Sequence, residues 1–228
     1  MKTKAFLLGV VTLLLAVGCA SKTKTVQVEI PPRVDLAAYP MVGLVTFSSN
    51  SKGELDRMST ERFLEAVQAA QPGTRVVELG TEQQVLASVK RNSFDATTLR
   101  ALKEMHGVDA IVMGRLDVKK AKADVNLSAG SFLKAMNVRQ NVDATLTTRL
   151  FEANSGATMW SDSSKVTVEL ANANFNSRGE GSFGATDKEA AYGEMVDGLV
   201  HYVTDDFRAH YVTRRVRKDD PAYANVAD

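Results

Sequence analysis

The spacing of hydrophobic and polar positions changes several times along the chain. Short continuous apolar runs at residues 41–47 and 74–80, and at the start of 108–127, are typical of strands that are buried on both faces. Between these runs, apolar positions three to four residues apart predict helices at 55–70, 82–90 and 95–107. The first half therefore predicts strands that are joined through helices.

Helix boundaries in this half carry local signals. Thr81 and Gln84 have the spacing of a capping box, in which each side chain bonds the other residue's backbone N–H. Gly107 follows the third predicted helix and is expected to end it in a left-handed conformation.

The second half has a different period. Residues 141–153 alternate between apolar and polar, Asn154-Ser155-Gly156 predicts a hairpin turn with a left-handed Gly156, and 157–171 is expected to return as the partner strand. The stretch 172–186 is rich in Asn, Ser and Gly and is expected to be a loop. A long amphipathic helix is predicted from Asp187 to Tyr211, with Ala191, Met195, Leu199, Val203, Phe207 and Tyr211 along one stripe.

These elements together predict an α/β (α+β mixed) fold in the order β-α-β-α-α-β-β-β-α. A mixed β-sheet of about five strands is expected to be flanked by helices and closed by the long C-terminal helix. Residues 41–211 are expected to form a single domain.

The N-terminus differs from the rest in composition. Residues 1–18 have a basic start, an apolar stretch and a final Gly18, which is the layout of an export signal. Cys19, the only cysteine of the chain, follows Ala16-Val17-Gly18 and resembles the lipobox of bacterial lipoproteins. That resemblance implies cleavage after Gly18, acylation of Cys19 and a flexible tether at 19–40. Because Ala20 follows the cysteine, it also implies the inner leaflet of the outer membrane, facing the periplasm. The alternative is an ordinary cleaved signal with a free cysteine.

Charge is nearly balanced. The formal net charge is +1, and without Lys2 and Lys4 the chain carries 26 basic and 27 acidic residues, so no nucleic-acid partner is expected. The one concentrated basic patch lies at the end of the last helix and in a tail at 212–228 that is expected to be flexible: Arg208, Arg214, Arg215, Arg217 and Lys218. Such cations either complement the helix dipole or contact anionic lipid, the cell wall or an acidic partner.

No pattern for catalysis stands out. Gly179, Gly181 and Gly184 have G-x-G-x-x-G spacing, but the acid that a dinucleotide site needs falls inside the predicted closing helix, so a surface loop is expected. His106, His201 and His210 do not have the spacing of metal ligands. We therefore assign no catalytic residue, cofactor or metal from the sequence.

Two stretches carry a resemblance to a family. "HGVDAIVMGRLD" (106–117) and "LTTRLFEANSGATMWSDSSKVTV" (146–168) are similar to the superfamily of the curli secretion lipoprotein CsgG, the TolB amino-terminal domain and LpoB. The resemblance covers roughly 41–211. It implies a non-enzymatic assembly or secretion accessory factor that binds an envelope protein and that forms homo-oligomers in some members.

Two alternatives remain open. One is an LpoB-like regulator of a peptidoglycan synthase. The other is a ligand-binding or hydrolytic periplasmic protein with a pocket near 48–54 and 172–186.

Overall fold

The computed structural model describes residues 23–51, 54–119, 122–127, 136–175, 181–185 and 187–217. It divides into two compact units. The larger unit is Pro32–Arg208. The smaller one is built by strands β1 (Thr23–Ile30) and β10 (His210–Arg217), which pair antiparallel.

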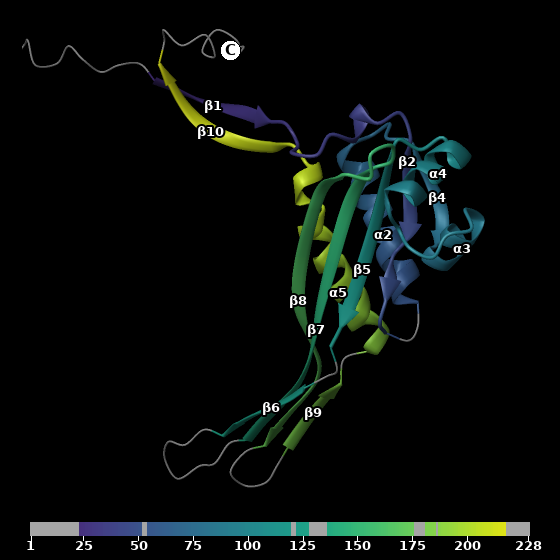
Figure 1. Ribbon diagram of the computed structural model, residues 1–228. Helices are drawn as coiled ribbons and strands as arrows, with labels where there is room; N and C mark the ends of the chain where they lie inside the picture. The colour runs from purple at the N-terminus through teal and green to yellow at the C-terminus, as the bar shows by residue number, and fades with distance from the viewer. Residues whose placement is uncertain are drawn as a thin grey trace, which may run out of the picture. The chain divides into compact units, whose positions relative to one another are not determined.

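The mixed sheet lies in the larger unit and has the strand order β4-β2-β5-β7-β8-β9 (Figure 1). β2 (Val42–Thr46) is parallel to β4 (Val76–Thr81) and to β5 (Ala110–Val118), because helices connect these strands. β7 (Met136–Glu152), β8 (Thr158–Phe175) and β9 (Gly181–Ala185) continue the sheet antiparallel. β3 (Ser48–Ser49) pairs with β5, and β6 (Lys122–Leu127) pairs with β7. The predicted fold class is confirmed.

Helices cover both faces of this sheet, but unequally. α2 (Leu55–Ala70) and α5 (Lys188–Val203) share the main core with the apolar side of β2, β5, β7 and β8. The rings of Phe63 and Trp160 both contact Phe207 in this core, at centroid distances of 5.9 and 4.9 Å. α3 (Glu82–Ser88) and α4 (Ala96–His106) pack on the other face over a smaller cluster that includes Val45, Leu102 and Ile111.

The antiparallel part of that second face is polar. Along β7 the side chains of Ala144, Leu146 and Leu150 are buried in the main core, whereas Thr147 and Arg149 lie on the opposite side. Such alternation is typical of an antiparallel sheet with one packed face and one solvated face. Because α3 and α4 cover only part of the second face, an apolar surface meets a polar surface at β5.

The predicted helix and turn signals are confirmed. The Thr81 hydroxyl and the Gln84 side chain form a capping box at the start of α3. Asp95 accepts from the Thr98 backbone N–H at 2.8 Å, and this bond lowers the pKa of the Asp95 carboxyl below its ordinary value. Gly107 and Gly156 have φ values of 68° and 75°.

The expected closing helix to Tyr211 is wrong at its C-terminal end. α5 ends at Val203, where Thr204 bonds the Val200 carbonyl through both its backbone N–H and its hydroxyl. A short 3-10 turn, η3 (Asp205–Phe207), places Phe207 in the core, and Tyr211 lies exposed in β10. The stripe of Ala191, Met195, Leu199 and Val203 is buried as predicted.

The structure also differs from the expected flexible tether and flexible tail. Residues 23–30 of the tether pair in register with 210–217 of the tail, from Thr23↔Arg217 to Ile30↔His210. Both segments are rich in β-branched residues, and each supplies the backbone partners of the other. We call this pair of strands the ribbon.

The expected loop at 172–186 is wrong as well. Its first four residues extend β8, and Gly181–Ala185 forms β9, which pairs with Ala171–Phe175. Backbone pairing with the long β8 strand overrides the weak strand propensity of Gly and Asn.

Candidate functional site

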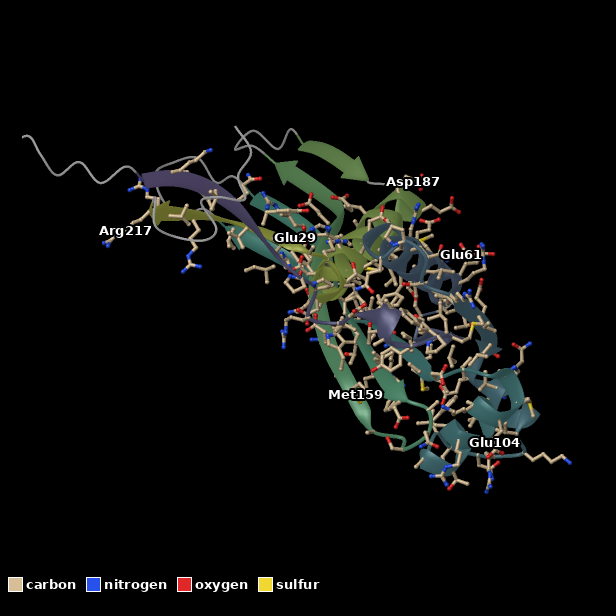
Figure 2. The ribbon with its side chains drawn as sticks, turned by 90° about the horizontal axis from the view of Figure 1, so that it is seen from above. Glu29, Glu61, Glu104, Met159, Asp187 and Arg217 are labelled. Carbon is tan, nitrogen blue, oxygen red and sulfur yellow. The ribbon has the colours of Figure 1, made fainter. Side chains whose placement is uncertain are left out.

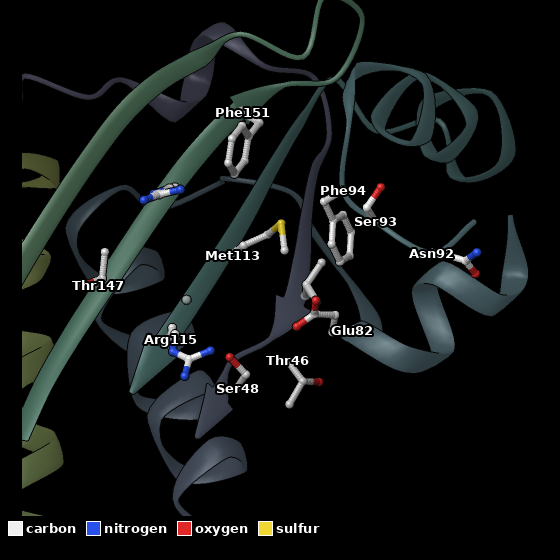
Figure 3. Close-up of a pocket in the computed structure, with 13 residues that line it drawn as sticks. Thr46, Ser48, Glu82, Asn92, Ser93, Phe94, Met113, Arg115, Thr147 and Phe151 are labelled. Carbon is white, nitrogen blue, oxygen red and sulfur yellow. The ribbon is translucent and has the colours of Figure 1, made fainter. Parts of the chain in front are cut away.

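A groove of about 540 Å³ lies where the apolar and polar parts of the second face meet (Figure 3). Strand β5 forms its floor with Met113, Gly114 and Arg115. The rest of the lining comes from β2 and β3 on one side, from β7 on the other, and from α3 and the α3–α4 connection: Val45, Thr46, Ser48, Thr147, Arg149, Phe151, Glu82, Asn92, Ser93 and Phe94. All of these residues belong to the larger unit.

One end of the groove is apolar. Phe94, Met113 and Phe151 are half-buried and pack against the smaller core cluster. Figure 3 shows their side chains toward the same end of the groove. The cluster thus has an apolar rim that the helices do not cover.

The other end carries Arg115 and hydroxyl groups, and Arg149 lies on β7 between this end and Phe151. Arg115 lies opposite Thr147, and Arg149 lies opposite Met113, so the two arginines are diagonal neighbours on adjacent strands. The Nε of Arg115 donates to both Asp117 carboxylate oxygens, at 3.1 and 3.2 Å. Arg149 forms no ion pair with any other residue that the structure describes.

An acidic group completes the lining. Glu82 is the first residue of α3, where a carboxylate interacts favourably with the helix dipole. Within the described chain it has no ion pair. The groove thus presents a cation and a carboxylate without internal partners, together with an apolar rim. This combination is suited to a ligand that has both apolar and dipolar character.

A further carboxylate stabilises the turn beyond β7. The Ser155 hydroxyl and the Ser155 backbone N–H both donate to Glu152. These bonds hold the pKa of the Glu152 carboxyl below its ordinary value. The strand that carries Arg149 and Phe151 therefore ends in a fixed turn.

The structure separates the residues of the predicted basic patch. Arg208 lies in the larger unit, where it donates to the His201 carbonyl and the Thr204 hydroxyl at the end of α5. Arg214, Arg215 and Arg217 lie on β10 of the ribbon. Lys218 and Cys19 fall outside the described residues.

The ribbon has two different faces. Strand register places Glu29, Tyr211, Arg215 and Arg217 on one face. The other face carries Val26, Val28, Ile30, Val212 and Val216 together with Arg214. Figure 2 shows the side chains of Glu29 and Arg217 on the ribbon.

The other sequence candidates do not meet at one site. Of the two loops that were expected to form a pocket, the first contributes Ser48 to the groove, and nothing described from 172–186 lines it. Gly181 and Gly184 belong to β9 rather than to a loop, and Gly179 lies outside the described residues. Among the described residues there is no group of His, Cys, Asp or Glu that could hold a metal ion. No helix in the described chain has the length and apolar character needed to cross a membrane.

Sequence reasoning missed the groove residues, although one signal for them was present. In the alternating stretch 141–153, Arg149 and Phe151 fall on the polar side of the strand. A phenylalanine on the solvated face of an antiparallel strand indicates a neighbouring apolar surface or a ligand.

Comparison with known proteins gives only distant likenesses. No protein-family model matches the chain, and no curated protein matches it. Among solved structures, it is similar to the PelC dodecamer from Paraburkholderia phytofirmans at 11% identity, covering 83% of this chain and 99% of that chain, with a TM-score of 0.42. The hypothetical protein CT253 from Chlamydia trachomatis matches at 10% identity over 72% and 92% of the two chains, with a TM-score of 0.45.

The LpoB C-terminal domain from Salmonella enterica matches at 12% identity over 55% of this chain and 81% of that chain, with a TM-score of 0.32. At these identities and TM-scores we infer function from the chain's own groove.

Proposed function

We propose that this protein is an outer-membrane lipoprotein that acts without catalysis, as an assembly or secretion accessory factor in the periplasm. It binds an envelope protein in the groove between α3–α4 and β7. The observation that carries this proposal is the pairing of an uncompensated Arg149 with an apolar rim at one open groove. Arginine, methionine and aromatic side chains are the residue types that are enriched in protein-binding sites.

Anchoring through Cys19 is the second part of the proposal. β1 begins at Thr23, four residues after that cysteine, and four extended residues reach at most about 14 Å. An acylated Cys19 therefore holds the ribbon near the lipid headgroups. The two strands carry four basic side chains against one acidic side chain, which favours contact with anionic lipid.

Affinity capture tests the binding part. Wild-type protein, Arg149→Glu and Arg139→Glu are purified by a tag from detergent-solubilised membranes, and the proteins recovered with them are quantified. Arg139 serves as the control because it is an exposed arginine of the same strand outside the groove. It differs from Arg149 in having an ion pair, with Glu169 at 3.7 Å.

We expect an envelope protein to be recovered with wild type and Arg139→Glu and to be depleted with Arg149→Glu. Equal recovery with all three proteins would refute binding at the groove. If the recovered protein is a peptidoglycan synthase, the LpoB-like alternative becomes the specific form of this function, and the rate of that synthase with and without the protein decides it.

Labelling tests the anchor separately. Cells that express wild type or Cys19→Ser are supplied with a radioactive fatty acid. We expect labelled protein in the outer-membrane fraction for wild type and no label for the variant. An unlabelled wild-type protein that still carries residues 1–18 would contradict the anchor.

A further inference from the structure

We propose that the groove binds a polypeptide segment that presents a carboxylate next to an apolar side chain. This inference rests on the proposed binding function and names the chemistry that the groove recognises. It is carried by the order of groups along the two strands of the groove, where Arg149 follows the apolar Phe151 on β7 and Arg115 follows the apolar Met113 on β5.

The cationic end is suited to a carboxylate. Arg149 is exposed and has no ion pair with the described residues, and Arg115 uses only its Nε toward Asp117. Diagonal positions on adjacent strands bring both long side chains within reach of one anion. A guanidinium binds a carboxylate through two parallel hydrogen bonds, which fixes orientation as well as charge.

Ser48 and Thr147 lie beside these arginines and supply hydroxyl groups. Ser48 pairs with Arg115 across β3 and β5, and the Thr147 hydroxyl lies 3.1 Å from the Ser163 hydroxyl. Figure 3 shows Ser48 and Arg115 near each other at the polar end of the groove. A carboxylate oxygen that one arginine does not satisfy finds a hydrogen-bond donor here.

The apolar rim accounts for the second half of the ligand. Phe94, Met113 and Phe151 are half-buried, so each presents part of its side chain to the groove. An aliphatic or aromatic side chain placed there is removed from water and contacts two rings and a thioether. A volume of about 540 Å³ accommodates two or three residues of a peptide.

Glu82 argues for a polypeptide over a polyanion. Its carboxylate lines the same groove and has no ion pair in the described structure. It repels the successive phosphates of a nucleic acid, whereas it accepts hydrogen bonds from backbone N–H groups or a basic side chain. A peptide supplies both the carboxylate for the arginines and the donors for Glu82.

The test uses four labelled peptides and the full mature chain, with binding followed by fluorescence anisotropy. The first peptide is acetyl-Lys-Gly-Phe-Phe with a free C-terminal carboxylate, and the second is its C-terminal amide. The third is acetyl-Lys-Gly-Phe-Asp-Phe-amide, and the fourth replaces the Asp by Asn. The first two test a terminal carboxylate, and the last two test a side-chain carboxylate.

We expect that, in at least one of the two pairs, the peptide with the carboxylate binds at least about tenfold more tightly than its neutral counterpart. Arg149→Met is expected to abolish that preference, Arg149→Lys to retain part of it, and Arg139→Met to leave it unchanged. Phe151→Ala is expected to weaken both members of the pair equally.

Several results would overturn this inference. One is equal binding of neutral and carboxylate peptides. Another is that Arg139→Met reduces the preference for the carboxylate peptide as much as Arg149→Met does. A third is that inorganic phosphate or oligonucleotides bind in a way that depends on Arg149 while no peptide binds. If no peptide binds but Arg149 still governs capture of an envelope protein from membranes, the peptide chemistry is wrong and the proposed function stands.

Discussion

Gln71 connects three segments of the larger unit through one side chain. Its Oε1 accepts from the Leu36 backbone N–H at 2.8 Å, and its Nε2 donates to the carbonyls of Val34 and Phe207 at 2.6 and 3.0 Å. The side chains of Val34, Leu36 and Phe207 are buried, and Phe207 is about 170 residues away in sequence from the segment that holds the other two. This amide therefore holds the chain that leaves the ribbon and the turn after α5 against the end of α2.

The cost of removing these bonds follows from their number. A buried hydrogen bond contributes about 1 kcal/mol net, so Gln71→Ala is expected to lower the free energy of unfolding by about 3 kcal/mol. For a chain of this size that corresponds to a fall in Tm of roughly 6–12 °C. Gln71→Glu keeps the acceptor but loses both donors, and it is expected to be destabilising to a similar extent at neutral pH.

Urea unfolding of the chain from Ala20 onward measures this cost. Trp160 is the only tryptophan and lies 4.9 Å from Phe207, so its fluorescence reports on the region that Gln71 holds. Gln68→Ala on the exposed side of α2 is the matched control and should change the free energy of unfolding by less than about 0.5 kcal/mol. Equal stability of Gln71→Ala and Gln68→Ala would refute the bridging role.

Three further predictions test packing and charge. Gly114→Ala should destabilise the protein by about 1–3 kcal/mol, because a Cβ there would lie 2.6 Å from ring atoms of Phe47. Gly193→Ala, in open space on α5, should stabilise the protein by about 0.5–1 kcal/mol. If urea unfolding showed Gly114→Ala to be more stable than Gly193→Ala, this packing would be contradicted. Trp160→Phe removes an indole N–H that donates to Asp206 at 3.0 Å and should cost about 1.5 kcal/mol; thermal unfolding that shows no loss would exclude a contribution from this bond. Because the pKa of Asp95 is lowered in the folded protein, its helix cap stabilises the fold fully above about pH 4 and less as pH falls through that pKa. The free energy of unfolding of wild type relative to Asp95→Asn should therefore fall between pH 5 and pH 2. A difference in stability that does not depend on pH would contradict this prediction.

Features with a local cause could be predicted from the sequence. The α2 helix, the Thr81 capping box and the left-handed Gly107 each depend on residues within one or two turns, and the structure reproduces them. The alternation of 141–153 likewise identified the strand and its buried side.

Features that depend on distant pairing could not be predicted. Residues 23–30 lack an apolar run, and their strand structure comes from pairing with 210–217, almost the whole chain away. The groove has a similar origin, because it exists only where α3 and α4 stop short of β7 and leave Phe151 half-buried. Nothing in the local sequence of Arg149 indicates that Arg115 is its diagonal neighbour or that Phe94 lines the same groove.

Photocrosslinking in intact cells tests the central claim, binding at the groove, most directly. A photoreactive benzoylphenylalanine replaces Phe94 at the apolar rim or, as a control, Glu104, which projects from α4 away from the sheet (Figure 2). We predict that the Phe94 position yields one recurrent adduct with an envelope protein, that Arg149→Glu abolishes this adduct, and that the Glu104 position does not form it. The same adduct from both positions, or an adduct that persists in Arg149→Glu, would contradict binding at the groove.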